Sequence, residues 1–178
     1  PIFLSEIPGL FQRDILPIDV ALISLSPPDE HGFCSYGVEV GTTKPAAEAA
    51  RYIIAEVNQK MPRTLGDSFL HVNFIDMLVP YDEPIIAVPV PEPDETLRRI
   101  GQNIARLVDD GSTIECGIGR IPQALAEFLR DKKDLGVHTE MFSDWIIDLI
   151  ECGAITCARK TINRNKVVAS FCMGSQRL

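Results

Sequence analysis

Residues 111–145, GSTIECGIGRIPQALAEFLRDKKDLGVHTEMFSDW, have the pattern of one strand–helix–strand unit. Ser112–Cys116 and Leu135–His138 are strand-like in composition, and the second strand is expected to end at Glu140. Pro122 suits the first position of the helix, because its φ angle fits there and its missing N–H would have no partner. The apolar residues that repeat at the spacing of a buried helix face are Ile121, Leu125, Phe128 and Leu129.

The turn Gly117-Ile118-Gly119 follows the first strand and opens the helix. Ligands of open α/β sheets bind at the carboxyl ends of strands, and this unit places the turn at one such end and Glu140 at another. A dinucleotide fingerprint would need a third glycine where the chain has Pro122, so that class is excluded. The N–H groups of the turn are candidates for binding an anion or an oxyanion. The alternative is an ordinary tight turn.

The residues before this unit predict further strands and helices. Pro1–Leu10 has the pattern of an edge segment, and Ile18–Leu25 is an apolar run of strand length. Ala46–Val57 is helical in composition, with Pro45 near its first turn. Leu70–Val79 is a second apolar segment and predicts another strand.

A proline-rich stretch, Pro80–Pro93, favours an extended connector and is the predicted domain boundary. Asp94 then has the character of a helix N-cap, for a helix that ends near Gly111. The apolar face of that helix is expected to comprise Leu97, Ile100, Ile104 and Leu107.

After Glu140, Ser143 is a candidate cap for a helix over Asp144–Glu151, which Gly153 ends. Its buried face is expected to carry Ile146, Ile147 and Ile150. Lys166–Met173 predicts a last strand, followed by a turn at Gly174-Ser175. Strands and helices therefore alternate, which predicts an α/β fold of open, mainly parallel sheets covered by helices.

Composition narrows the class of protein. The chain has 178 residues and a formal net charge of −8, and no basic stripe is present, which argues against nucleic-acid binding. No apolar run approaches the roughly 18 residues of a membrane span, and no signal peptide precedes the first strand. We expect neither a membrane partner nor a leader.

The five cysteines, Cys34, Cys116, Cys152, Cys157 and Cys172, form no C-x-x-C pair. They predict reduced, buried thiols of a cytoplasmic protein. No metal site is expected, because neither C-x₂-C nor H-x₃-H spacing occurs. Cys116, beside the glycine turn, is the only candidate for a functional thiol.

Several segments match one known family in order. They are SPPDEHGFCSYG (26–37), MPRTLGDSF (61–69), ECGIGRIPQALAEFL (115–129), DKKDLGVHTEMFSDW (131–145) and FCMGS (171–175). Together they resemble the acetyl-CoA hydrolase and transferase family, specifically its 4-hydroxybutyrate CoA-transferase type. The resemblance implies the CoA-transferase architecture in two similar domains, with residues 1–93 ending the first domain and residues 94–178 beginning the second.

The same resemblance implies roles for particular residues. Glu140 matches the catalytic nucleophile, and the CoA-contacting loop falls on Gly117, Ile118, Gly119, Arg120 and Ile121. Four further residues are candidates for the substrate cleft: His31, Arg63, His138 and Trp145. Three of them have a plainer interpretation: a solvated loop histidine for His31, a loop salt bridge for Arg63 and a histidine bonded to backbone for His138. Trp145 stands where relatives usually have glycine, and it could narrow or cap the acyl site.

The implied activity is CoA transfer from an acyl-CoA to a short carboxylic acid, in a ping-pong cycle through a glutamyl-CoA thioester. CoA would enter as a thioester substrate, with no bound cofactor, and its phosphates would need local cations such as Arg120, Arg63 or Lys44. An acyl-CoA hydrolase using the same glutamate and a non-catalytic acyl-CoA-binding module are the alternatives. Family members are more than twice this length, and later glycine-containing segments complete their CoA site, so residues 1–178 alone are expected to be inactive. The full-length enzyme is expected to be a homodimer.

Overall fold

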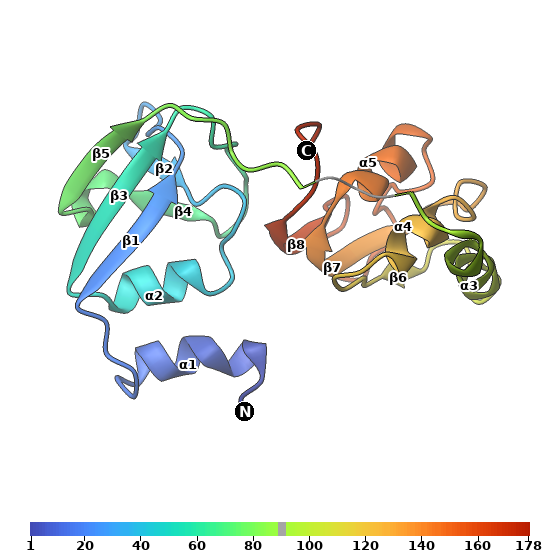
Figure 1. Ribbon diagram of the computed structural model, residues 1–178, viewed down its shortest axis with the longest axis horizontal. Coiled ribbons are helices and arrows are strands. Elements are labelled where there is room, and N and C mark those ends of the chain that lie inside the picture. The colour runs from blue at the N-terminus through green and yellow to red at the C-terminus, as the bar shows by residue number, and fades with distance from the viewer. Residues whose placement is uncertain (89–91) are drawn as a thin grey trace. The chain divides into compact units, whose positions relative to one another are not determined.

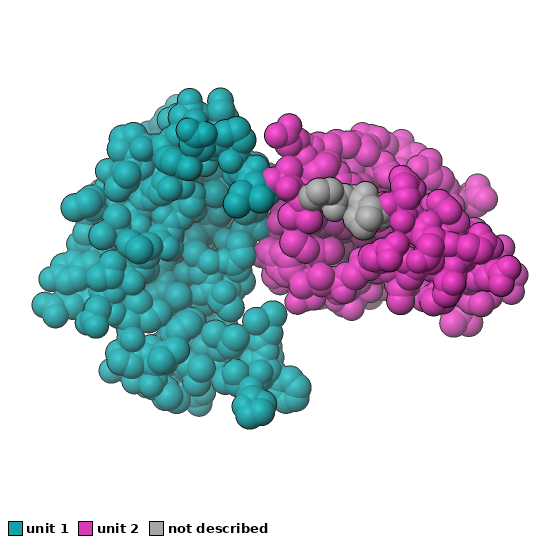
Figure 2. Space-filling model, in the orientation of Figure 1, with its two compact units in different colours: residues 1–86 teal, residues 87–178 magenta. Residues whose placement is uncertain are grey.

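The computed structural model describes residues 1–88 and 92–178, which form two compact units, Pro1–Ile86 and Ala87–Leu178 (Figures 1 and 2). The division falls within the proline-rich stretch 80–93, of which residues 89–91 lie outside the described part. Each unit contains a three-stranded parallel sheet with helices packed beside it. The predicted α/β class with mainly parallel sheets is confirmed.

Unit 1 is organised around the parallel sheet β1-β3-β5. Its strands are β1 (Val20–Leu25), β3 (Tyr52–Asn58) and β5 (Met77–Tyr81). Helix α2 (Thr43–Ala49) packs on one face of the sheet, and helix α1 (Ile7–Gln12) packs on α2. The buried residues of this core include Ala21, Ile23, Leu25, Ala47, Ile53 and Ala55. A separate antiparallel pair joins β2 (Phe33–Ser35) to β4 (Phe69–His71), and short 3₁₀ turns occupy Leu4–Glu6 and Val72–Phe74.

The other face of this sheet is apolar and exposed. Val20 pairs with Tyr52 in register, Leu22 with Ile54, and Ile54 in turn with Met77. Of these, Val20, Leu22, Tyr52 and Met77 are exposed hydrophobic side chains. The alternation of buried and exposed residues along β1 follows from the two-residue period of a strand that buries one face only.

Three predictions in unit 1 were wrong. The segment 1–10 is helical and not an edge strand. The predicted helix over 46–57 ends at Ala49, and the rest forms β3, where Ile53, Ile54 and Val57 favour a strand because β-branched side chains restrict the helix. The predicted strand over 70–79 is divided between β4 and β5, because the His71 ring accepts a hydrogen bond from the Asn73 N–H and turns the chain.

Unit 2 has the parallel sheet β6-β7-β8. Its elements are α3 (Glu95–Ala105), β6 (Thr113–Ile114), α4 (Ile121–Ala126), β7 (Gly136–Phe142), α5 (Asp144–Glu151) and β8 (Val168–Cys172). Asp94 caps α3 as predicted, since its Oδ1 accepts a hydrogen bond of 2.9 Å from the Leu97 N–H. The predicted end of α5 is also confirmed, because Gly153 follows it with a φ of 83°, where glycine is favoured.

The predicted helix faces agree only in part with the observed ones, since Ile146 is buried and Ile104 packs against the core as predicted. In α3 the buried residues are Gly101 and Ala105, whereas Leu107 lies beyond the helix and is 84% exposed. A Cβ atom at Gly101 would lie 2.8 Å from the Ala124 carbonyl carbon, so α3 and α4 pack backbone against backbone. In α5 the buried residues are Trp145, Ile146 and Leu149, while Ile150 is exposed. Apolar spacing did not reveal that small residues define the contact of α3.

Ser143 occupies the N-cap position of α5, but its hydroxyl makes no capping bond and is buried without a partner among the described residues. The predicted position of the cap is therefore confirmed and the predicted bond is not. Within the same residues, no helix is both long enough and apolar enough to cross a membrane.

Lys160 is a buried cation that the sequence did not single out. Its side chain is 2% exposed, and its Nζ donates to the Val137 carbonyl at 2.7 Å and the Lys166 carbonyl at 2.8 Å. These carbonyls belong to β7 and to the segment before β8. Gly136 leaves room for the lysine stem, since a Cβ there would lie 2.6 Å from Lys160 Cγ. The lysine therefore ties two neighbouring parts of the sheet together.

We expect Lys160→Met to lower the free energy of unfolding by about 2–4 kcal/mol, because two carbonyls lose a charged donor and each unsatisfied buried acceptor costs about 1–3 kcal/mol. Urea denaturation would measure the change. Lys133→Met, at an exposed lysine, is the matched control and should leave the midpoint nearly unchanged. Equal stability of the two variants would show that the Lys160 contacts contribute nothing net.

Candidate active site

The register of β6 on β7 brings the glycine turn beside Glu140. Thr113 pairs with Gly136 and Ile114 with Val137, and continuing this register by three residues places Gly117 opposite Glu140. A Cβ atom on Gly117 would lie 3.5 Å from Glu140 Oε2. The predicted proximity of carboxylate and turn is therefore present in the structure. The glycine matters here because it lets the backbone lie next to the carboxylate.

Glu140 lies inside β7 and not at its end, which corrects the predicted boundary. The strand continues to Phe142 because it pairs with β8 on both sides of Glu140, as Thr139↔Ala169 and Met141↔Phe171. On the β6 side, backbone pairing stops at Val137. Glu140 is half-buried, and no described residue donates a hydrogen bond to its carboxylate. The Glu140 carboxylate therefore lies beside Gly117, past the point where β6 and β7 are paired.

The N–H groups of the turn are also without acceptors in the described part of the chain. No described residue accepts a hydrogen bond from the N–H of Gly117, Ile118 or Gly119. Ile118 and Gly119 are exposed, and nothing lies within 4 Å of a Cβ built on Gly119. Gly117 does not adopt a positive φ, so close approach and not backbone conformation explains the glycine at that position.

The glycine turn leads directly into α4, with Arg120 at the N-cap position of the helix. The helix begins at Ile121, so Pro122 is its second residue and not its first as predicted. Ile121 is 40% exposed, and of the predicted buried face only Leu125 is both within α4 and buried. Phe128 and Leu129 follow the end of the helix at Ala126, and Leu129 joins the core from there. The Arg120 guanidinium lies 3.7 Å from Asp94 Oδ2 and donates to the Glu92 carbonyl at 3.3 Å. Arg120 is therefore a partly neutralised surface cation beside the turn.

Two cleft candidates in unit 2 have different surroundings. His138 lies two residues before Glu140 and so on the same face of β7; its side chain is exposed, and no described residue hydrogen-bonds to its ring. Trp145 is buried within the core of unit 2, among residues such as Leu125 and Ile146. Its indole thus packs mainly against protein, and a role toward an acyl group stays a prediction.

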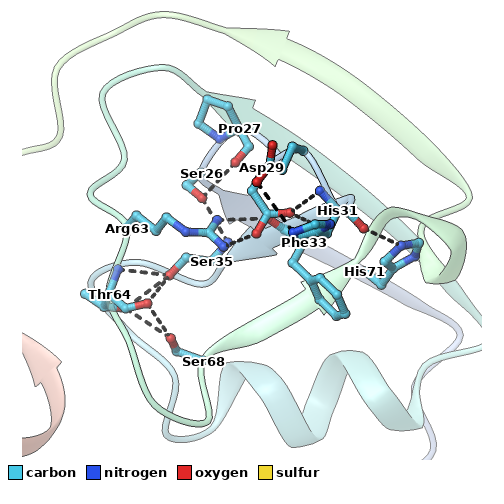
Figure 3. A network of polar contacts seen from close by, with 11 residues as sticks. Ser26, Pro27, Asp29, His31, Phe33, Ser35, Arg63, Thr64, Ser68 and His71 are labelled. Carbon is cyan, nitrogen blue, oxygen red and sulfur yellow. Dashed lines mark hydrogen bonds and ion pairs between the residues drawn. The ribbon is translucent and has the colours of Figure 1, made fainter.

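The other two candidates, His31 and Arg63, lie in a polar network of unit 1 (Figure 3). Arg63 Nη2 donates to Asp29 Oδ2 at 2.6 Å, and Nη1 donates to the Phe33 carbonyl at 2.9 Å. Asp29 also accepts from the N–H groups of Phe33 and His31. These bonds, that from Phe33 foremost, lower the pKa of Asp29 from its ordinary value. Arg63 thus joins two of the family-like motifs through a salt bridge, the plainer alternative considered for it.

The His31 side chain is 74% exposed, and the residue joins the network through its backbone N–H and carbonyl. Its carbonyl lies 3.0 Å from Nε2 of His71. Lys44, another candidate cation for phosphates, pairs with Glu48 and Asp67. The cations of unit 1 proposed for substrate binding are therefore engaged with neighbouring carboxylates.

Asp144 forms a contact at the carboxyl end of the sheet that sequence reasoning missed. Its Oδ2 accepts from the Ser175 N–H at 2.8 Å, and its Oδ1 accepts from the Ser175 hydroxyl. Gly174 permits this approach, because a Cβ there would overlap Asp144 Oδ2. The turn after β8 is thereby held against the first residue of α5. Only the presence of a glycine-serine turn was visible in the sequence.

A surface cleft of about 490 Å³ lies in unit 2, away from Glu140, which is not among its lining residues. The side chains that line it include Glu127, Arg130, Trp145, Asp148 and Arg177. Arg177 Nη1 lies 2.6 Å from Asp148 Oδ1, and the same guanidinium pairs with Glu151. Across the described residues, no group of three or more His, Cys, Asp or Glu is arranged to hold a metal ion.

All five cysteines are free, but they are not all buried as predicted, because Cys152 is exposed and Cys172 is half-buried. Burial, and secondarily Glu115, raises the pKa of Cys116 to about 11. Desolvation penalises the thiolate, so the neutral thiol persists at neutral pH. This chemistry disfavours Cys116 as a nucleophile and leaves Glu140 as the candidate beside the turn.

We expect iodoacetamide to alkylate Cys152 much faster than Cys116 in the folded protein at pH 8. Cys152 is accessible, whereas Cys116 is buried and, at a pKa of about 11, only about a thousandth is thiolate. Mass spectrometry of the two peptides would measure the rates, with the urea-unfolded protein as control. Similar rates in the folded protein would contradict the burial and the assignment of Cys116 as inert.

The fold and this site define an α/β protein with a carboxylate and a glycine turn side by side at the end of a short parallel ladder. Residues 1–91 match the family model of the acetyl-CoA hydrolase/transferase N-terminal domain. This chain therefore belongs to the acetyl-CoA hydrolase/transferase family.

Curated relatives include the 4-hydroxybutyrate coenzyme A transferase of Clostridium kluyveri, 48% identical over the whole chain, which covers 42% of that protein. The succinyl-CoA:acetate/propanoyl-CoA:succinate CoA transferase of Fasciola hepatica is 45% identical, and the whole chain covers 37% of it. Among solved structures, a 4-hydroxybutyrate CoA-transferase from Porphyromonas gingivalis is 43% identical, with a TM-score of 0.94 over 100% of this chain and 46% of that one. The chain thus spans about two-fifths of the length of the curated relatives it matches.

Proposed function

We propose that this chain supplies the nucleophilic glutamate of an acyl-CoA:carboxylate CoA-transferase, and that this residue is Glu140. The observation that carries the proposal is the half-buried Glu140 carboxylate, without a hydrogen-bond donor among the described residues, beside the glycine turn. The names of the relatives, which are CoA transferases for short carboxylic acids, support the same activity.

In the first half of the cycle, the Glu140 carboxylate is first the nucleophile and then the group that is attacked. Glu140 attacks the thioester carbonyl of the acyl-CoA, which forms an acyl-glutamyl anhydride and releases CoA thiolate. The thiolate then attacks the glutamyl carbonyl of the anhydride, which releases the donor acid as a carboxylate and leaves a glutamyl-CoA thioester. Two displacements of moderate difficulty replace one difficult step.

The second half runs the same steps with the acceptor acid. Its carboxylate attacks the glutamyl thioester, CoA thiolate leaves, and the thiolate attacks the acyl carbonyl of the new anhydride. The products are the new acyl-CoA and free Glu140 carboxylate. Thioester energy is conserved only if water stays out of the site, so a hydrolase could use the same residues with greater water access.

The turn has a defined part in this scheme. The N–H groups of Gly117, Ile118 and Gly119, which no described residue engages, would donate to the oxyanion formed when a carbonyl is attacked. Each well-placed donor is worth roughly 3 kcal/mol in the transition state. Arg120 and the exposed Ile118 would contact the CoA chain beside the turn. A cytoplasmic homodimer belongs to the same proposal, and the free cysteines fit that compartment.

The activity can be tested in a protein of full family length that contains residues 1–178. We expect acetate to accept CoA from a short acyl-CoA at least about 100-fold faster than water does, since a transferase must exclude water from its intermediate. Chromatography of the CoA products separates the two rates. Hydrolysis at a rate equal to transfer would make the protein a hydrolase, and binding without turnover would make it an acyl-CoA-binding module.

A further inference from the structure

Thr139 connects the strand that carries Glu140 to the segment that leads into the glycine turn. Its hydroxyl accepts a hydrogen bond of 2.9 Å from the Cys116 N–H and donates one of 2.7 Å to the Cys116 carbonyl. The side chain is buried, at 6% exposure. A hydroxyl can both donate and accept, so this one group satisfies both backbone groups of Cys116.

This bridge replaces a backbone ladder at the point where the ladder stops. Backbone pairing between β6 and β7 ends at Ile114 and Val137, two residues before the bridge. Beyond that point, and among the described residues, the two segments are joined by the Thr139 side chain and not by main-chain hydrogen bonds. The hydroxyl therefore sets the separation of the strands where Gly117 and Glu140 follow.

The bridge is one peptide away from both parts of the candidate site. Gly117 follows Cys116, and Glu140 follows Thr139. The Gly117 backbone and the Glu140 carboxylate lie close enough that a Cβ on Gly117 would be 3.5 Å from Oε2. We expect a change in the Thr139 bridge to alter this separation, because backbone pairing between β6 and β7 ends at Ile114 and Val137.

We propose that Thr139 is a positioning residue that sets the distance between the Glu140 carboxylate and the N–H groups of the glycine turn. The proposal rests on the proposed role of Glu140 as the nucleophile. Thr139 itself is buried and uses its hydroxyl on Cys116, so it acts through the turn and not on the substrate.

The test compares Thr139→Val, which keeps the shape and removes the hydroxyl, with Thr139→Ser, which keeps the hydroxyl. In the full-length protein, we expect Thr139→Val to lower the first-order rate of CoA attachment to Glu140 by about 100-fold, because misplacement by about 1 Å can cost that much. The KM for acyl-CoA should change less than about threefold, since the binding contacts remain. Thr139→Ser should restore most of the rate.

Thr113→Val is the matched control, because Thr113 is an exposed threonine of β6 and makes no bridge to the turn. It should attach CoA at nearly the wild-type rate. If Thr139→Val is not recovered folded, Thr139→Ala removes the same hydroxyl and is expected to show the same loss. Amide hydrogen exchange at Cys116 should rise in Thr139→Val and not in Thr113→Val.

The outcomes separate the two claims. If CoA attaches to Glu140 equally fast in the wild type and in Thr139→Val, the positioning role of Thr139 is overturned, while the role of Glu140 as the nucleophile stands. Equal losses in Thr139→Val and Thr113→Val would also overturn it. A wild-type protein that gains no adduct on Glu140 would overturn both the proposed function and this inference.

Discussion

Glu140→Gln should abolish CoA transfer, lowering kcat by roughly 10⁴-fold or more, the scale seen when a covalent nucleophile is removed. The amide keeps the size of the side chain but cannot attack a thioester carbonyl. Because the half-buried carboxylate has no hydrogen-bond donor among the described residues, the fold should tolerate the change. Steady-state assays with acyl-CoA and acetate measure the loss, and the melting temperature checks the fold.

The matched control is Glu115→Gln, which neutralises an exposed carboxylate in the segment just before the turn. It should retain most of the activity, because Glu115 lies outside the proposed path of the reaction. If both variants lost activity to a similar degree, net charge near the turn and not a nucleophile at 140 would be the cause. Full activity in Glu140→Gln would remove the proposed mechanism.

Gly117→Val should lower kcat by about 100-fold while leaving the protein folded, since displacement of a reacting group by about 1 Å can have that effect. A Cβ at this position already lies 3.5 Å from Glu140 Oε2, so the two methyl groups of valine would enter the space over the carboxylate. Gly117 does not adopt a positive φ, so the backbone accepts the substitution without strain.

Gly117→Ala provides the graded comparison. Its Cβ would make an ordinary van der Waals contact with the carboxylate, so a loss well below that of valine is expected. Rates of CoA attachment, compared at equal folded concentration by circular dichroism, distinguish the variants. Equal activity of wild type and Gly117→Val would show that the space beside Gly117 is not used.

The relation between turn and carboxylate was largely predictable from sequence. A strand, a glycine turn, a helix beginning near Pro122 and a second strand follow one another in a single connection, and parallel strands bring such ends to one edge. The family-like motifs supplied the expected role of Glu140. The register that places Gly117 opposite Glu140 was not predictable, because it depends on which residue of β6 pairs with which residue of β7.

Other features could not be predicted from the sequence, because they arise from tertiary contacts. Tyr52–Asn58 continues an alanine-rich helical pattern, yet it forms the central strand of unit 1 because both of its edges are paired. Gly101 gave no apolar signal, although a Cβ atom there would lie 2.8 Å from the Ala124 backbone of α4. Lys160 and Thr139 are polar residues that each bond to a partner 23 residues away, Val137 for Lys160 and Cys116 for Thr139.

Peptide mapping after incubation of the full-length protein with acyl-CoA alone tests the central claim most directly. A thioester on Glu140 raises the mass of the peptide that contains it by the mass of CoA less one water, and Glu140→Gln should show no such peptide. If Cys116 were the nucleophile, it would instead take the acyl group as a thioester and release CoA, so its peptide would be heavier by the mass of the donor acid less one water. The account predicts the first mass on Glu140, and either the second mass on Cys116 or an unmodified Glu140 peptide would contradict it.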